Sequence, residues 1–240
     1  MFALFKKKIL SFLPLEHQAD SISNNHDKII EVIKSLLNND ICIVFDLGAH
    51  HGSYSKAIND RVDDVQIHSF EPFPKAFSIL EQKLAAPNYH LYPIALSNIN
   101  GSAVFYINKL DETNSLLPSA ITNSPIDFLT FNEKTIEVQV RTIDNICKQE
   151  NISRIDVLKI DAQGNTLNIL IGAVELLQLK KIKVIQCEVE FLEVYISQSL
   201  FHHTTTFLER YGYSLYSLYN VHYDVNQRIS WADALYYLND

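Results

Sequence analysis

The chain alternates between segments with helical hydrophobic spacing and short continuous apolar runs. Residues 24–38 place apolar side chains on one helical face, and Asn25 or Asp27 can cap the start of that helix. Residues 41–45 form a continuous apolar run, which is typical of a strand buried on both faces of a sheet. The pattern then predicts helix 53–59, strand 65–70, helix 75–84 after Pro74, and strand 90–95. Strands that alternate with helices in this way predict a doubly wound α/β sheet.

The middle of the chain interrupts this alternation. Residues 102–107 predict a strand, and the preceding Asn100-Gly101 pair is typical of a hairpin turn that would join it to a neighbouring strand. Residues 108–135 are polar and lack a firm period, whereas residues 136–140 predict a short strand. A loop of this length in a compact domain usually has a function, so we expect residues 108–135 to shape a binding pocket.

The alternation resumes after the middle segment and completes the sheet. It predicts helices at residues 142–149, 166–179 and 200–211, and strands at residues 156–160, 184–189, 214–219 and 232–238. We therefore expect about seven strands, mostly parallel, with helices on both faces and an antiparallel pair at one edge. Residues 41–240 then form a single domain with an inserted loop region at about 98–141, and residues 1–40 form an N-terminal helical extension.

Charge and hydropathy narrow the partners that the chain can have. It carries 20 Lys and Arg against 28 Asp and Glu, a net charge of -8, so it has no excess of cations for a phosphate backbone. We expect no nucleic-acid partner. No apolar run approaches the roughly 20 residues that a membrane helix needs, so we expect no integral membrane association and a cytoplasmic location. The sequence leaves the oligomeric state open.

The N-terminal segment MFALFKKKILSFLP has two interpretations. It can form a short terminal helix, or its lysines can make weak peripheral contact with an anionic membrane surface. One short basic segment contributes only about 1 kcal/mol per charge, which favours the first interpretation.

The first predicted strand ends in the motif Asp46-x-Gly48-x-x-x-Gly52. Gly48 allows a tight turn and a close approach of a ligand, and Gly52 precedes a helix whose first amides point toward that ligand. The dinucleotide fingerprint Gly-x-Gly-x-x-Gly is absent, and Asp46 would repel a pyrophosphate but attract a cationic amino acid or sulfonium group. The motif therefore favours S-adenosylmethionine over a nicotinamide dinucleotide.

The second predicted strand ends in Glu71-Pro72. A Rossmann-type sheet places at this position the acid that accepts hydrogen bonds from ribose hydroxyls. Asp46 and Glu71 together indicate a nucleoside-containing cofactor. The alternative is that both acids only cap helices in their loops.

Several segments from about Ile43 to Tyr237 resemble a known family when taken in order. They are VFDLGAHHGSYS, HSFEPFPKAFSIL, YPIALSNINGSAVFY, TNSLLPS, VQVRTIDNI, IDVLKIDAQGNTLNILIGA, IQCEVE and SWADALYYL. In these segments the chain resembles the FkbM family of methyltransferases. The resemblance implies a Rossmann-like class I methyltransferase fold, S-adenosylmethionine as the donor, and usually O-methylation. The family's substrates include sugars, glycolipids and polyketide-type natural products.

The resemblance also implies roles for individual residues. The methionine part of the donor would lie against Asp46, Gly48 and Gly52, the ribose against Glu71, and the adenine beside Ala95, Leu96 and Ser97, with Asn114 and Ser115 on a loop near the donor. The remaining residues of the predicted donor site are Ala49, His50, Tyr54, Ser55, Pro72 and Asp161.

Two positions depart from the family pattern. The family commonly has Asn where His50 stands, and the segment after Lys-Ile-Asp commonly reads Gly-x-Glu-Leu, where this chain has Thr166 in place of the acid. These departures motivate an alternative hypothesis, namely a catalytically impaired protein of the same fold that binds S-adenosylmethionine.

The fourth strand is predicted to deliver the catalytic acid or base. It ends in Lys159, Asp161 and Gln163 at the same edge of the sheet as the glycine motif. Methyl transfer needs an aligned acceptor hydroxyl and a route for its proton, so Asp161 is the first candidate for a general base or for orienting the hydroxyl. His50 and His51 are the rivals, because imidazole titrates near neutral pH.

The fifth strand adds acids to the same edge. Glu188 and Glu190 share one face, because side chains alternate along a strand. Lys159 and Glu188 complete the predicted catalytic set, although the two can instead form a simple ion pair. Asp161 and Glu188 could also hold Mg²⁺, but two carboxylates alone do not make a metal site, so we expect none. The sequence thus predicts an O-methyltransferase that acts on a hydroxyl of a sugar or sugar-containing metabolite, with a small-molecule or glycan acceptor.

Overall fold

The computed structural model of the chain describes residues 19–120 and 132–239. The basic N-terminal segment, for which two interpretations were given, lies outside the described residues, as do residues 121–131 of the expected loop.

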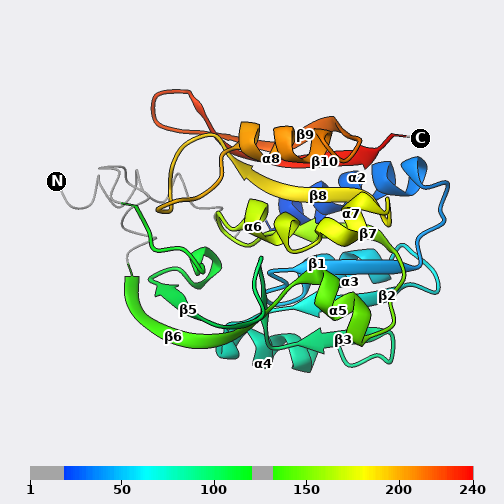
Figure 1. Cartoon of the computed structure of the whole chain (residues 1–240), viewed down its shortest axis with the longest axis horizontal. Coiled ribbons are helices and arrows are strands. Elements are labelled where there is room, and N and C mark those ends of the chain that lie inside the picture. Colours follow the sequence, from blue (N-terminus) through cyan, green and yellow to red (C-terminus); the bar gives the residue numbers. More distant parts are fainter. Residues whose placement is uncertain (1–18, 121–131, 240) are drawn as a thin grey trace.

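A mostly parallel sheet runs through the centre of the protein (Figure 1). Within the described residues it has seven strands, in the order β3 (Tyr89–Tyr92), β2 (Gln66–Phe70), β1 (Ile43–Leu47), β7 (Ile155–Ile160), β8 (Ile182–Glu190), β10 (Ile229–Leu238) and β9 (Tyr213–Tyr223). β10 is antiparallel to both of its neighbours, and the strands from β3 to β8 are parallel. The expected Rossmann-like fold with an antiparallel pair at one edge is confirmed.

A second, smaller sheet occupies the predicted insertion. It contains β4 (Ala95–Leu96), β6 (Asn132–Arg141) and β5 (Gly101–Asn108), with β6 in the middle. The hairpin expected around Asn100-Gly101 is wrong, because β4 and β5 flank that turn but pair with opposite edges of β6. The expected loop at residues 108–135 is also shorter, since β6 begins at Asn132.

The strand expected at residues 90–95 is two strands that belong to different sheets. β3 ends at Tyr92 in the main sheet, and β4 begins at Ala95 in the smaller one. Pro93 lies between them and has no N–H to donate to a ladder, which favours a break at this point.

Helices cover both faces of the main sheet, as expected (Figure 1). One face is covered by α2 (Ala19–Leu36), α3 (Ser53–Asn59) and α4 (Pro74–Lys83). The other is covered by α5 (Ile143–Gln149), α6 (Thr166–Ile171), α7 (Val174–Gln178) and α8 (Phe201–Glu209). The single helix expected at residues 166–179 is broken at Gly172. A Cβ there would lie 2.1 Å from the backbone oxygen of Ser97, so the end of α6 packs directly on the chain that leaves β4.

The N-terminal helix α2 belongs to the central core. Ile29, Ile30 and Ile33 have no exposed surface and pack in one cluster with apolar residues of β1, α3, β2 and β7. Each fully buried isoleucine contributes about 1.5–3 kcal/mol of burial free energy. Asp27 also forms an ion pair with Arg61 beyond the end of α3. α2 therefore completes one face of the sheet.

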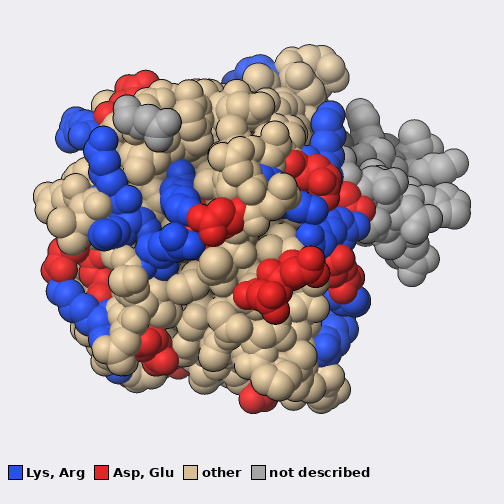
Figure 2. Space-filling view, turned by 90° about the vertical axis from the view of Figure 1, so that its right-hand side faces the viewer, with Lys and Arg blue, Asp and Glu red and all other residues tan. Residues whose placement is uncertain are grey.

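Acids and bases lie side by side at the end of the molecule where the parallel strands begin. Figure 2 shows Lys and Arg side chains next to Asp and Glu side chains on this face. Lys183 and Arg154 each form ion pairs with Asp40 and with the buried Asp156. These acids partly neutralise the positive charges, which weakens their attraction for a phosphate backbone. The expectation of no nucleic-acid partner stays a prediction. In residues 19–120 and 132–239, no helix combines the length and apolar character that crossing a membrane requires.

Candidate active site

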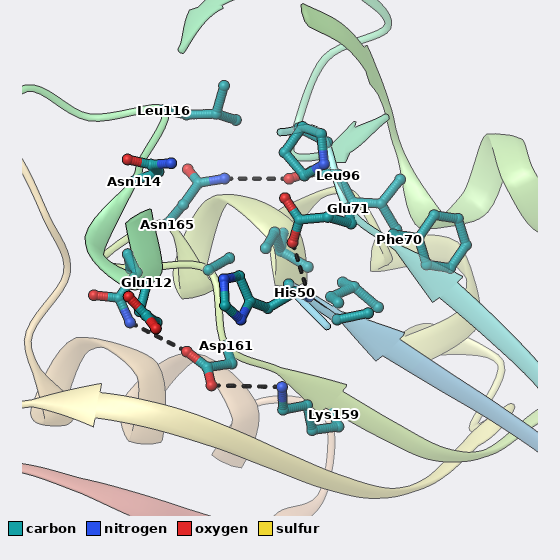
Figure 3. Close-up of a pocket in the computed structure, with 18 of the residues that line it drawn as sticks. His50, Phe70, Glu71, Leu96, Glu112, Asn114, Leu116, Lys159, Asp161 and Asn165 are labelled. Atoms are coloured by element: carbon teal, nitrogen blue, oxygen red, sulfur yellow. Dashed lines mark hydrogen bonds and ion pairs between the residues drawn. The ribbon is translucent and has the colours of Figure 1, made fainter. Parts of the chain in front are cut away.

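A cavity of about 310 Å³ opens at the carboxyl ends of β1, β2 and β7. Its walls come from the loops after these strands, from β4, and from the short 3-10 helix η2 (Asp111–Thr113) of the inserted region. Ligands of open α/β sheets bind at this edge, where the strand order reverses beside β1. Figure 3 shows His50 in the middle of the cavity, between Glu71 and Asp161.

Three backbone segments meet below the cavity. The amides of Gly48 and Ala49 both donate to the carbonyl oxygen of Phe70, and the amide of Asp161 donates to Leu47. Gly48 has a φ of +72°, and a Cβ there would lie only 1.8 Å from the backbone oxygen of Asp161. Glycine is therefore required at position 48, because both its conformation and the contact exclude a side chain.

Glu71 presents a carboxyl group to the cavity from the end of β2. Its side chain accepts hydrogen bonds from the amides of His50, at 2.9 Å, and Phe73, at 2.8 Å. Burial nevertheless raises the pKa of Glu71 to about 7. Each carboxyl oxygen has room for one more donor, so Glu71 can accept hydrogen bonds from two neighbouring hydroxyl groups.

An apolar slot adjoins Glu71. It is lined by Pro72, Ile94, Ala95, Leu96, Phe105 and Leu116. Asn165 closes the slot from the β7 side and donates through Nδ2 to the carbonyl oxygen of Leu96, at 3.2 Å (Figure 3). In the described chain, Asn114 Nδ2 is buried at the cavity wall without a hydrogen-bond partner. The slot therefore suits a flat ring with a polar edge.

Asp46 lies behind the cavity and is fully buried. Ser55 Oγ donates to it at 2.7 Å, and Lys159 Nζ lies 3.2 Å from its other oxygen, because Asp46 and Lys159 are register partners in β1 and β7. Burial favours the neutral amine, yet the carboxylates of Asp46 and Asp161 keep the pKa of Lys159 above its usual value. The alternative ion pair between Lys159 and Glu188 does not occur among the described residues, since both ion-pair partners of Lys159 are aspartates.

Asp161 presents a second carboxyl group to the cavity, directly after β7. The two acids of η2, Asp111 and Glu112, also line the cavity. The side chain of Asp161 is 42% exposed, and Lys159 Nζ lies 3.5 Å from one oxygen while Gln163 Nε2 donates to the other at 3.2 Å. Gln163 Nε2 also donates to Glu188 at 3.0 Å, and its oxygen accepts from the buried Tyr195 hydroxyl. Gln163 thereby fixes Asp161 in place and separates it from Glu188.

The amide of Gln163 occupies the position that a bridging cation would need between Asp161 and Glu188. No group of three or more metal-ligating side chains occurs among the residues that the structure describes. The Mg²⁺ alternative for Asp161 and Glu188 accordingly has no support.

Further acids lie behind Glu188 on the same face of the sheet. Burial raises the pKa of Asp233, on β10, to about 6 and that of Glu190 to about 8, and burial together with Asp161 raises the pKa of Glu188 well above its usual range. In the described part of the chain, neither carboxyl oxygen of Glu190 has a hydrogen-bond partner. Ionising this group is therefore costly in the folded protein.

Glu190→Gln should stabilise the protein at high pH only. An ionised Glu190 is penalised in the fold but not in the unfolded chain, so the cost grows as pH rises from about 4.5 toward about 8. A relief of about 1 kcal/mol raises the melting temperature by roughly 2–4 °C in a chain of this size. Melting curves at pH 5 and pH 8 test this, with the exposed Glu193→Gln as the matched control. Equal gains at both pH values would contradict the assignment.

The two adjacent histidines differ in their placement. His50 lines the cavity with a φ of +48°, which is uncommon outside glycine and occurs often at functional sites. Its Nε2 is buried and, among the described residues, has no partner, and burial lowers the pKa of His50. His51 stacks on His50 with ring centroids 3.7 Å apart but lies outside the cavity lining. Of the two rivals to Asp161, only His50 reaches the cavity.

The structure brings most of the predicted site residues together. Those that line the cavity are Gly48, Ala49, His50, Tyr54, Glu71, Pro72, Ala95, Leu96, Asn114, Lys159 and Asp161. Those that lie outside its lining are Asp46, His51, Gly52, Ser55, Ser97, Ser115 and Glu188.

Several of the outlying residues have clear structural contacts. A Cβ on Gly52 would come within 2.8 Å of Leu80 and Leu84, so this glycine lets α3 approach α4. Ser115 Oγ donates to the backbone of Gln163 at 2.6 Å and ties the inserted region to β7. Thr166, which replaces the family's acid, donates to the backbone oxygen of Glu188 at 3.1 Å.

The lining residues that sequence reasoning missed include Asn165, His26 and the two acids of η2, Asp111 and Glu112. Asn165 follows the end of β7 closely, and residues that follow a strand end can be expected at this edge of the sheet. His26 comes from α2, and nothing in the sequence places that helix beside the glycine motif.

Solved structures share this sheet and its helices. Magnesium protoporphyrin IX methyltransferase from Synechocystis PCC 6803, solved with bound S-adenosylmethionine, superimposes with a TM-score of 0.51 at 11% sequence identity, over 90% of this chain and 79% of that one. An rRNA methylase from Streptococcus thermophilus gives a TM-score of 0.47 at 9% identity, over 89% and 95% of the two chains. The likeness to the first of these structures concerns the fold alone, which is that of the class I methyltransferases.

The family follows from the sequence match. Residues 46–215 match the model of the methyltransferase FkbM domain, so the chain belongs to that family and carries a methyltransferase domain. The 2-O-methyltransferase NoeI of Sinorhizobium fredii is 25% identical over 179 residues, which cover 71% of this chain and 72% of the relative. The resemblance inferred from the sequence segments is confirmed.

Proposed function

We propose that the protein is an S-adenosylmethionine-dependent O-methyltransferase that acts on a hydroxyl group of a sugar or sugar-containing metabolite. The observation that carries this proposal is the pairing, in one cavity, of Glu71 beside an apolar slot with the exposed carboxylate of Asp161. The name of the relative, a 2-O-methyltransferase, supports oxygen as the methylated atom. The sugar class rests on the acceptors known for the family.

The residues present fit S-adenosylmethionine. Glu71 would accept hydrogen bonds from the two ribose hydroxyls, and the slot beside it would hold the adenine, with Asn114 Nδ2 as a donor to the ring edge. Asp161 would attract the donor's positive charge at the end of the cavity opposite to Glu71. β1 separates β2 from β7, and neighbouring strands lie about 4.8 Å apart, so the two ends are separated by roughly 10 Å.

The residues of the chain would perform two tasks. They would orient the donor and the acceptor hydroxyl, and they would take up the proton of that hydroxyl. The donor supplies a methyl group on a cationic sulfur, which a hydroxyl oxygen can attack in line. Asp161 would accept the proton of that hydroxyl, because it is a partly exposed carboxylate of the cavity lining that Lys159 and Gln163 hold in place. Glu71 would hold the ribose and thereby fix the position of the methyl group relative to Asp161.

Glu71→Gln should weaken binding of the product S-adenosylhomocysteine at least tenfold. The amide retains the shape but offers one acceptor oxygen instead of two, and a hydrogen bond to a charged group is worth about 1.5–3 kcal/mol. Calorimetric titration measures the loss, and the exposed Glu81→Gln on the same side of the sheet is the matched control. Wild-type protein with no affinity for donor or product would refute the donor assignment.

Turnover is tested with isotopically labelled S-adenosylmethionine. Incubation with a cell extract rich in glycans, followed by mass spectrometry, should yield a labelled methyl ether on a sugar. Donor binding without any labelled product would favour the alternative, a catalytically impaired protein of the same fold. Label on nitrogen or carbon would refute O-methylation.

A further inference from the structure

Two buried polar atoms at one end of the cavity have no partner within the described chain. They are Nδ1 of His26, on α2, and the hydroxyl oxygen of Tyr54, at the start of α3. Both residues line the cavity, and Tyr54 is only 2% exposed. Buried polar atoms are almost always hydrogen-bonded in native proteins, so this end of the cavity is built for a ligand with acceptor atoms.

Contacts with neighbouring residues hold His26 and Tyr54 in place. The His26 ring meets the Tyr54 ring edge-on, with centroids 5.5 Å apart. α2 is held by its buried isoleucines and by the ion pair between Asp27 and Arg61. Because side chain and helix are both fixed, the His26 ring cannot easily turn away from the cavity.

Lys159 brings an ammonium group to this end of the cavity, where it lies between the carboxylates of Asp46 and Asp161. Its Nζ lies 5.5 Å from the centre of the Tyr54 ring, and its pKa stays above the usual value. Burial and Lys159 lower the pKa of His26, so its imidazole is neutral at pH 7 and can donate through one ring nitrogen. A neutral imidazole N–H and a phenol O–H that lie side by side offer two hydrogen-bond donors to a carboxylate.

This end lies opposite the one assigned to the nucleoside. Tyr54 follows the glycine motif directly, and Lys159 and Asp161 come from β7, whereas Glu71 and the apolar slot lie on the other side of β1. Asp161 adds a partly exposed carboxylate to the same end. A negative group and two hydrogen-bond donors side by side match a zwitterionic amino acid.

We infer that His26 and Tyr54 bind the α-carboxylate of the donor's methionine moiety, which makes the N-terminal helix part of the donor site. This inference rests on the proposed function. It extends the site beyond residues 46–215, which match the family model, because α2 precedes that segment.

Two ligands that differ only at the amino-acid end test the inference. S-adenosylhomocysteine carries the carboxylate, and 5′-methylthioadenosine lacks the whole amino-acid group. His26→Ala and Tyr54→Phe should each weaken S-adenosylhomocysteine about tenfold or more and change 5′-methylthioadenosine less than twofold, as measured by calorimetry. Lys28→Ala, at an exposed position of the same helix, is the control and should leave both affinities unchanged.

Tyr54→Phe separates binding from folding. It removes a buried hydroxyl that has no partner in the described chain, so the melting temperature should stay the same or rise while affinity for S-adenosylhomocysteine falls. Equal losses for both ligands, or no loss for either, would overturn the inference and leave the proposed function standing. Wild-type protein that binds neither ligand would refute the proposed donor and the inference with it.

Discussion

Asp161→Asn is expected to lower kcat about 10²- to 10⁴-fold, which is the usual contribution of a general base. Asparagine keeps the size of the side chain and the hydrogen bond from Gln163, but it cannot take up the proton of the acceptor hydroxyl. Binding of S-adenosylhomocysteine should change much less than turnover. Rates of labelled methyl transfer at saturating donor, together with calorimetric titration, measure the two effects separately.

Comparing His50→Gln with Asp161→Asn tests which of the two residues is the general base. His50 also lines the cavity, and its Nε2 has no partner among the described residues. With Asp161 as the base, His50→Gln should keep turnover within about tenfold of the wild type. The assignment to Asp161 fails if the two variants show the opposite ranking.

Gly48→Ala is expected to abolish measurable donor binding and to lower the melting temperature by several degrees. The new methyl group would lie 1.8 Å from the backbone oxygen of Asp161, and a backbone oxygen cannot rotate away. The loop after β1 would have to separate from the chain that leaves β7, which breaks the hydrogen bond from the amide of Asp161 to the carbonyl oxygen of Leu47. The left-handed conformation alone costs an alanine about 1–2 kcal/mol.

Gly212→Ala isolates that conformational cost. Gly212 has a φ of +90°, and its nearest contact for a Cβ is a Leu238 methyl group at 3.8 Å. This variant should lose only about 1–2 kcal/mol of stability and keep its affinity for S-adenosylhomocysteine. If Gly48→Ala behaves like this control, the close contact with Asp161 is not needed for the site.

The central strands could be predicted because they are buried on both faces. The apolar run at residues 41–45 overlaps β1, and the strand predicted at residues 156–160 matches β7, although β7 also contains the buried Asp156 and Lys159. The partner of β5 could not be predicted, because the Asn100-Gly101 turn is a local pattern whereas pairing with β6 is decided by distant residues. The break at Gly172 likewise depends on a contact with Ser97 that no local pattern contains.

The site was predictable where it depends on strand ends and unpredictable where it depends on register. Gly48 and Glu71 follow buried strands, so their positions at one edge could be inferred. Asp46 was expected to face the ligand, but the register of β1 against β7 places Lys159 beside it and turns it into a buried counter-ion. The role of His26 requires the docking of a whole helix, which a single sequence does not report.

The strand order of the main sheet also governs how the protein can assemble. β10 lies between β8 and β9 although it follows both along the chain, so β9 reaches the sheet only through β10. A growing polypeptide therefore exposes β8 as an unpaired edge until residues 229–238 have been synthesised. Docking of the β9–β10 hairpin closes contacts between distant segments and is expected to be a late, slow event. Until then, chaperones have an open edge to shield.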